Sequence, residues 1–229
     1  MFQRRAHSVR THDLLEIDAK QFISPYASAP EWVEEELRRT PFVVVRRGPA
    51  KEQNIPVGVR GVERNQRWAA FCHPKLVKSI IIPPQLRRRA VPTLRADATP
   101  ALRALNLIKD RWMGLDPPWG PDGSVGFELA TGCLAAKPES DLDIVIYAER
   151  CMTADEAKSL CDSTMNLPAT VDIRVETPIC GFSLWEYASQ SPAPILLRTP
   201  FGVMLGNDPW DELETRSTMS TAERRSRMI

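Results

Sequence analysis

The fold is decided near the middle of the chain, by the stretch Ser140-Asp141-Leu142-Asp143-Ile144-Val145-Ile146-Tyr147. Its run of apolar and β-branched residues predicts a strand over residues 141–147. Successive strand side chains point to opposite faces of a sheet, so Asp141 and Asp143 share one face while the apolar residues between them enter the core. Two neighbouring carboxylates repel each other unless a cation such as Mg²⁺ binds between them. The stretch therefore predicts a strand that carries two candidate metal ligands.

A second strand, expected over residues 170–176, carries another acidic residue. Its apolar and polar residues alternate, which places Asp172 on the polar face. Between the two strands, the capping box Thr153-Ala154-Asp155-Glu156 predicts a helix that continues to about Met165. If the two strands are neighbours in the sheet, Asp172 completes a site of three carboxylates. The three aspartates are thus the candidate catalytic residues and metal ligands.

A glycine-rich segment, Gly123-Ser124-Val125-Gly126, precedes these aspartates. Glycine lets a phosphate approach the backbone closely, and a serine hydroxyl and free amides at a helix start can donate hydrogen bonds to it. We therefore take Gly123, Ser124 and Gly126 as candidate substrate-binding residues. Each motif alone has an ordinary explanation, because a lone Asp-x-Asp is more often an exposed strand edge and a lone Gly-Ser more often a turn. Their order along the chain favours a site.

The remaining pattern predicts an α+β protein in two parts. Residues 1–90 are rich in short apolar runs and form an expected strand-rich module for substrate recognition. Residues 91–211 form the expected catalytic domain, and residues 212–229 lack apolar periodicity and are expected to be disordered. Local signals predict further elements: a helix from a capping box at Ser28 to Arg39, a helix from Pro100 to about Met113, a helix over residues 181–189 and a hairpin over residues 195–205.

Three arginines of the first part, Arg60, Arg64 and Arg67, lie close together in sequence. Guanidinium groups bind phosphates through two parallel hydrogen bonds, so these residues are candidate substrate ligands. A solvated surface face explains them equally well. A second arginine cluster, residues 87–89, is explained more simply as a solvated charge run than as a docking site.

The overall composition excludes several classes of protein. The net charge is +1, so the whole molecule is not strongly attracted to nucleic acid or to an anionic membrane. The five cysteines form no C-x-x-C pair, which argues against a zinc site or a disulfide framework and fits the cytoplasm. No apolar segment follows the arginines at the N-terminus, so no signal peptide is expected.

The order of motifs, Gly-Ser, Asp-x-Asp, helix and strand Asp, resembles the DNA polymerase β-like nucleotidyltransferase superfamily. The gap between Gly-Ser and Asp-x-Asp is longer here than in its small members, which points to a narrower family. Within the superfamily, the chain resembles the phosphoribosyl-dephospho-CoA transferases, the holo-acyl-carrier-protein synthases of malonate decarboxylase. The segments that carry this resemblance are residues 10–15, 56–61, 66–70, 119–121, 123–132, 140–143, 171–173, 196–199 and 208–210.

The resemblance implies a fold, a reaction and roles for residues. The fold is a mixed sheet with helices on one face. The reaction moves the prosthetic group of triphosphoribosyl-dephospho-CoA to a serine of the apo acyl-carrier subunit and releases pyrophosphate. Asp141, Asp143 and Asp172 would hold two metal ions, with Mg²⁺ expected and Mn²⁺ as an alternative. Gly123 and Ser124 would bind the leaving pyrophosphate. No nucleic acid or membrane partner is implied.

Two other functions fit the same motifs. One is another nucleotidyltransferase of the superfamily, such as the synthase that serves citrate lyase, and the metal site alone does not separate it from the first. The other is a non-catalytic nucleotide-binding module on a decayed fold, against which the intact Asp141, Asp143 and Asp172 argue.

Overall fold

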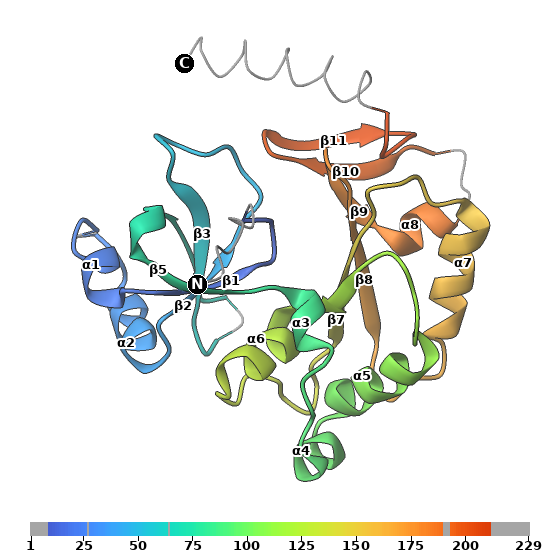
Figure 1. The fold of residues 1–229 in the computed structure, drawn as a ribbon, viewed down its shortest axis with the longest axis horizontal. Coiled ribbons are helices and arrows are strands. Elements are labelled where there is room, and N and C mark those ends of the chain that lie inside the picture. Colours follow the sequence, from blue (N-terminus) through green and yellow to red (C-terminus); the bar gives the residue numbers. More distant parts are fainter. Residues whose placement is uncertain (1–8, 27, 64, 190–192, 212–229) are drawn as a thin grey trace, which may run out of the picture. The chain divides into compact units, whose positions relative to one another are not determined.

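The computed structural model describes the chain except for residues 1–8, 27, 64, 190–192 and 212–229. The tail expected to be disordered and Arg64 therefore lie outside the described residues. The chain divides between Ile82 and Pro83 into two units, and each contains one sheet together with helices (Figure 1). The expected α+β class is confirmed. Within the described residues, no helix has the length and apolar character needed to cross a membrane.

The first unit is built around an antiparallel sheet with strand order β4-β3-β2-β1-β5. Its strands are β1 (Leu14–Ile17), β2 (Phe42–Val45), β3 (Ile55–Arg60), β4 (Arg67–Cys72) and β5 (Val77–Ile81). The helices are α1 (Ala19–Ile23), α2 (Glu31–Arg39) and the short 3-10 helix η1 (Pro74–Leu76). Phe22 of α1 and Leu37 of α2 pack with strand residues in one hydrophobic core, so these helices cover the sheet.

The capping box predicted at Ser28 is wrong. Helix α2 begins at Glu31 with Pro30 as its N-cap, and no side chain caps it. Ser28 instead lies in a turn that is closed by a hydrogen bond from the Ala29 amide to the Tyr26 carbonyl, 3.0 Å long. The extended backbone of Pro30 separates this turn from the helix. The predicted end of the helix at Arg39 is confirmed.

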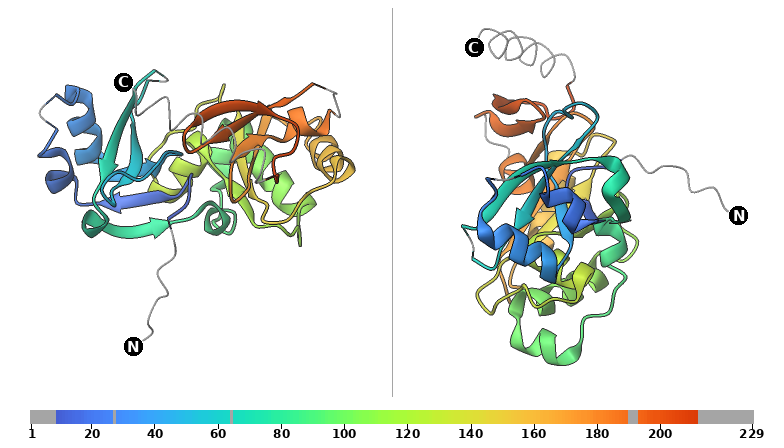
Figure 2. Two further views of the ribbon diagram at one scale, coloured as in Figure 1. Left: turned by 90° about the horizontal axis from the view of Figure 1, so that it is seen from above. Right: turned by 90° about the vertical axis from the view of Figure 1, so that its left-hand side faces the viewer.

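The second unit contains a mixed sheet with strand order β11-β10-β9-β8-β7-β6 (Figure 1). Figure 2 shows the ribbon of this unit, green to red, from two further sides. Strands β7 and β8 run parallel, and the other neighbours are antiparallel. The strands are β6 (Trp119–Pro121), β7 (Leu142–Tyr147), β8 (Val171–Glu176), β9 (Gly181–Ser183), β10 (Ile195–Thr199) and β11 (Gly202–Gly206). The helices are α3 (Pro83–Leu86), α4 (Thr93–Ala98), α5 (Pro100–Arg111), α6 (Gly123–Thr131), α7 (Ala154–Ser163) and α8 (Leu184–Ala188).

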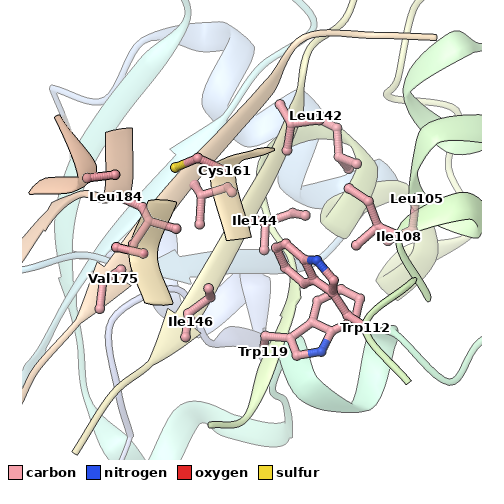
Figure 3. Packing of buried hydrophobic residues seen from close by; sticks show 14 of the residues in the cluster. Leu105, Ile108, Trp112, Trp119, Leu142, Ile144, Ile146, Cys161, Val175 and Leu184 are labelled. Carbon is pink, nitrogen blue, oxygen red and sulfur yellow. The ribbon is translucent and has the colours of Figure 1, made fainter. Parts of the chain in front are cut away.

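Alternate residues of β7 and β8 build the core of this unit. Ile144 and Ile146 of β7 pack with Val175 of β8, with Ile108 of α5 and with Cys161 of α7 (Figure 3). Burial in β8 has period two, which leaves Asp172 and Arg174 half-buried on its other face. On that same face of β7, Asp143 is half-buried and Val145 is buried. The core therefore packs against one face of both parallel strands, and this packing positions Asp143 and Asp172.

Several other local predictions are tested by the second unit. The capping box at Thr153 is confirmed, because the Thr153 and Glu156 side chains each accept a hydrogen bond from the other's backbone amide. The hairpin over residues 195–205 is also confirmed, as β10 and β11. The helix predicted over residues 181–189 is partly wrong, because residues 181–183 pair with β8 and β10 before α8 begins.

Candidate active site

Asp143 and Asp172 lie side by side on the two parallel strands. Asp143 of β7 is the register partner of Asp172 of β8, which places their Cα atoms about 4.8 Å apart at the ordinary strand spacing. Register partners share a face of the sheet, so both carboxylates lie on the face opposite the core. Asp172 can join the site only if β7 and β8 are neighbouring strands, and the structure shows that they are.

Asp141 lies just outside its strand, unlike the other two aspartates. Strand β7 begins at Leu142, so Asp141 is the residue before the strand, and it is exposed. Among the residues that the structure describes, no group of three or more His, Cys, Asp or Glu side chains is placed to hold a metal ion. The structure thus brings two of the three predicted aspartates into register, and the third ligand remains a prediction.

Gly123 at the start of α6 touches the Asp143 carboxylate. A Cβ atom added to Gly123 would lie 1.9 Å from Asp143 Oδ2, far inside any allowed contact. Gly123 also has φ +59°, a left-handed conformation that side chains disfavour. The amide of Asp122 donates a 2.9 Å hydrogen bond to the Asp143 carbonyl and fixes the helix start to β7. The Gly-Ser motif and the Asp-x-Asp motif therefore meet at one place.

Ser124 and Gly126, the other two predicted residues of the motif, are both buried. A Cβ atom on Gly126 would lie 2.7 Å from the Pro121 carbonyl oxygen, so this glycine lets α6 pack closely against the end of β6. The structure accounts for Gly126 by packing, whereas Gly123 lies directly against the carboxylate pair.

Arg174, which none of the sequence motifs includes, is a cation beside the carboxylate pair. Its Nη2 atom lies 3.6 Å from Asp172 Oδ2, and about two fifths of each side chain is exposed to solvent. The two residues share the polar face of β8 because they are two positions apart. This spacing was visible in the sequence, but only the neighbouring β7 shows that Arg174 faces the same region as Asp143.

Glu128 of α6 is buried and forms an ion pair with the partly buried Arg95 of α4. Arg95 Nε and Nη2 donate to the two carboxylate oxygens at 2.8 and 3.0 Å, and the amides of Ala135 and Ala136 each donate at 2.9 Å. Arg95 Nη2 also donates to the Ala136 carbonyl at 2.9 Å. Glu128 therefore holds α4 and the segment after α6 together, and a role as a ligand to substrate is not needed to explain it.

Burial raises the pKa of Glu128, but the hydrogen bonds from Arg95, Ala136 and Ala135 outweigh it and leave the pKa below its ordinary value. A carboxyl with a lowered folded-state pKa stabilises the protein above its unfolded pKa of about 4.3. That contribution is lost as the pH falls through the folded value.

We expect Glu128→Gln to lower the free energy of unfolding by about 2–4 kcal/mol at pH 7, because it leaves Arg95 without its buried partner. Below about pH 4.3 the wild type loses the stabilisation that the ionised Glu128 provides. The variant has no carboxyl at this position, so its free energy of unfolding should fall less over the same pH range. Denaturant unfolding at several pH values measures both effects. The exposed Glu139→Gln is the matched control, and equal loss of stability in the two variants would contradict the structural role.

Two of the predicted arginines of the first unit, Arg60 and Arg67, lie at the end of the β3–β4 hairpin. Arg60 and Arg67 are register partners and share a face of that sheet. Arg67 Nη1 donates to the carbonyls of Gln66, at 2.9 Å, and Glu63, at 3.4 Å. Part of the Arg67 guanidinium thus stabilises its own turn, and its ability to bind a substrate stays a prediction.

Comparison with known proteins identifies the family on both units. The family model described as the phosphoribosyl-dephospho-CoA transferase MdcG C-terminal domain matches residues 85–209, and the corresponding N-terminal domain model matches residues 10–83. No solved structure was found to match the chain.

Curated relatives agree with the family models. A phosphoribosyl-dephospho-CoA transferase of Pseudomonas aeruginosa is 34% identical over 207 residues, which are 90% of this chain and 96% of the relative. The transferase of Azotobacter vinelandii is 36% identical over 82% of this chain and 88% of its own length. That of Klebsiella pneumoniae is 32% identical over 90% of this chain and 98% of its own length. The chain therefore belongs to the phosphoribosyl-dephospho-CoA transferase family and is a transferase enzyme.

Proposed function

We propose that this enzyme transfers phosphoribosyl-dephospho-CoA from its triphosphate precursor to a serine hydroxyl of an apo acyl-carrier protein, the carrier subunit of malonate decarboxylase. The serine oxygen forms a bond to the α-phosphorus, and the bond from that phosphorus to the bridging oxygen breaks. The bridging oxygen keeps the bonding electrons and leaves as part of pyrophosphate, while the serine loses its proton. A phosphodiester joins the carrier to the prosthetic group.

The observation that supports this proposal best is the register of Asp143 with Asp172, with the start of α6 against Asp143. Two adjacent carboxylates offer the hard oxygen ligands that Mg²⁺ prefers, so the residues fit a divalent cation. When bound, such a cation would neutralise the charge that develops on the phosphates. We assign Asp141 as the third ligand, in keeping with the polymerase β-like nucleotidyltransferases that the motif order resembles.

The chain's own groups would position the reactants. Asp172 would face the attacking hydroxyl and accept its proton. The backbone at Gly123 and the Ser124 hydroxyl would hold the leaving pyrophosphate at the start of α6. Phosphoryl transfer depends mainly on positioning and charge neutralisation, which suits a site without an evident covalent nucleophile. A cytoplasmic setting fits the five cysteines, for which the structure shows no disulfide.

This function is tested by measuring both products, the modified carrier and pyrophosphate. We expect one pyrophosphate to be released for each carrier modified, and a carrier whose acceptor serine is replaced by alanine should stay unmodified. The apo carrier of citrate lyase serves as the second acceptor. Efficient transfer to that carrier alone would overturn the assignment to malonate decarboxylase while leaving the reaction itself in place.

We also propose that Arg60, Arg64 and Arg67 of the first unit bind phosphates of the donor. Arg60→Ala is expected to weaken donor binding by about 1–3 kcal/mol, because a charged hydrogen bond is lost. The effect should appear in the KM for the donor, with less change in the KM for the carrier. Steady-state kinetics with each substrate varied in turn measure it. Unchanged donor KM values in alanine variants of all three arginines would show that they form a solvated face.

A further inference from the structure

The polar face of the second sheet continues past the carboxylate pair, from β8 to β11. Arg174 of β8 is the register partner of Ser183 in β9, and Gly181 of β9 is the register partner of Arg198 in β10. Residues in register point to the same side of a sheet, so Arg174 and Arg198 share the face of Asp143 and Asp172. At ordinary strand spacing and rise, the Cα atoms of the two arginines lie about 12 Å apart.

The two arginines are exposed enough to meet a ligand. Both are half-buried, and Arg174 is paired only loosely with Asp172, at 3.6 Å. For Arg198, no ion pair or side-chain hydrogen bond is found in the part of the chain that the structure describes. Between them, β9 presents only the serine at 183 and the glycine at 181. Glu176 of β8, the register partner of Gly181, lies on the same face.

An apolar strip borders these arginines at the sheet edge. Val203 of β11 is the register partner of Arg198, and Leu205 lies two residues further along the same face. Their side chains are 68% and 63% exposed, unusual values for large aliphatic residues on two adjacent positions of one face. Met204, between them, points to the opposite side and packs on the core.

The other end of the same face is closed. A Cβ atom on Gly120 of β6 would lie 1.9 Å from the Pro83 carbonyl oxygen, so α3 lies directly on the sheet there. Val145 of β7, the register partner of Gly120, is accordingly fully buried. The face is therefore covered at β6, and we expect a ligand held at Asp143 and Asp172 to extend across the arginines toward β11, at the other end of the strand order. Figure 1 shows β8, β9, β10 and β11 in this order.

We propose that the face from β8 to β11 binds the dephospho-CoA portion of the donor, with Arg174 and Arg198 on its diphosphate and with Val203 and Leu205 against its pantetheine arm. This inference rests on the proposed function. Dephospho-CoA carries a diphosphate followed by a long, largely uncharged arm, which matches a pair of cations followed by an apolar strip. Guanidinium groups suit the diphosphate because each can donate two parallel hydrogen bonds to it.

Binding of dephospho-CoA to the full chain, measured by calorimetry without the triphosphate or the carrier, tests the inference. We expect Arg198→Met to weaken binding at least 10-fold while the melting temperature stays the same. Arg103→Met, which removes an exposed arginine from α5, is the matched control and should leave the affinity unchanged. Equal affinity of the Arg198 variant and the wild type would overturn the assignment.

Comparing the binding of dephospho-CoA with that of ADP distinguishes the role of the arginines from that of the apolar strip. Val203→Ser should weaken binding of dephospho-CoA several-fold but leave binding of ADP, which lacks the pantetheine arm, unchanged. Arg198→Met should weaken the binding of both ligands. If Val203→Ser affects neither ligand, or affects both equally, the assignment of the pantetheine arm to β11 is wrong.

The same data distinguish this inference from the proposed function. If the wild type modifies the carrier but Arg198→Met changes neither dephospho-CoA affinity nor donor KM, the inference fails and the function stands. If Arg198→Met weakens dephospho-CoA binding as expected but no carrier is ever modified, the proposed function fails on its own.

Discussion

Asp143→Asn is expected to reduce carrier modification at least about 10³-fold, which corresponds to roughly 4 kcal/mol of transition-state stabilisation. The change is nearly isosteric but removes the charge from the aspartate that lies in register with Asp172 and against Gly123. The melting temperature without metal should stay the same or rise slightly, because repulsion between neighbouring carboxylates is relieved. Initial rates of carrier modification, together with thermal unfolding, measure both effects.

The control for this variant is Asp97→Asn, which removes an exposed carboxylate from α4. It should retain the wild-type rate. A purified Asp143→Asn enzyme that also works at near the wild-type rate would refute the assignment of the site.

Gly123→Ala is expected to lower the rate of carrier modification at least about 10²-fold and to destabilise the fold by about 1–2 kcal/mol. The added methyl group would occupy the position of the Asp143 carboxylate, so that side chain must turn away from its place beside Asp172. The left-handed backbone at φ +59° adds strain of its own. Rate measurements well below the melting temperature separate the loss of geometry from the loss of stability.

Gly132→Ala provides a matched control for the strain. Gly132 follows the end of α6 with φ +76°, and an added Cβ atom would meet nothing within 4 Å. This variant should lose a similar amount of stability but keep the wild-type rate. Equal loss of activity in the two variants would show that strain in α6, and not the contact with Asp143, explains the effect.

The sequence predicted the two aspartate-bearing strands because their signals are local. Apolar alternation defined β8, and the capping box at Thr153 defined the helix between the strands. That each aspartate lies on the polar face of its own strand followed from the alternation of side chains. Whether the strands were neighbours required the long-range pairing of β7 with β8, which no local pattern contains.

The features that the sequence did not predict depend on contacts between distant residues. No local pattern indicates the ion pair of Glu128, because its partner Arg95 lies 33 positions away. Arg89 was grouped with a solvated charge run, but its guanidinium donates to the carbonyls of Leu129 and Ala130 at the end of α6. Such hydrogen bonds become visible only once the chain is folded.

The account is tested most directly by the intact mass of the apo acyl-carrier subunit of malonate decarboxylase after incubation with this enzyme, triphosphoribosyl-dephospho-CoA and Mg²⁺. We predict a mass gain of one phosphoribosyl-dephospho-CoA group per carrier, which is absent when a chelator replaces Mg²⁺ and when Asp143→Asn replaces the wild type. An unchanged carrier mass, or an equal gain in the presence of the chelator, would contradict metal-assisted transfer by the aspartates of β7 and β8.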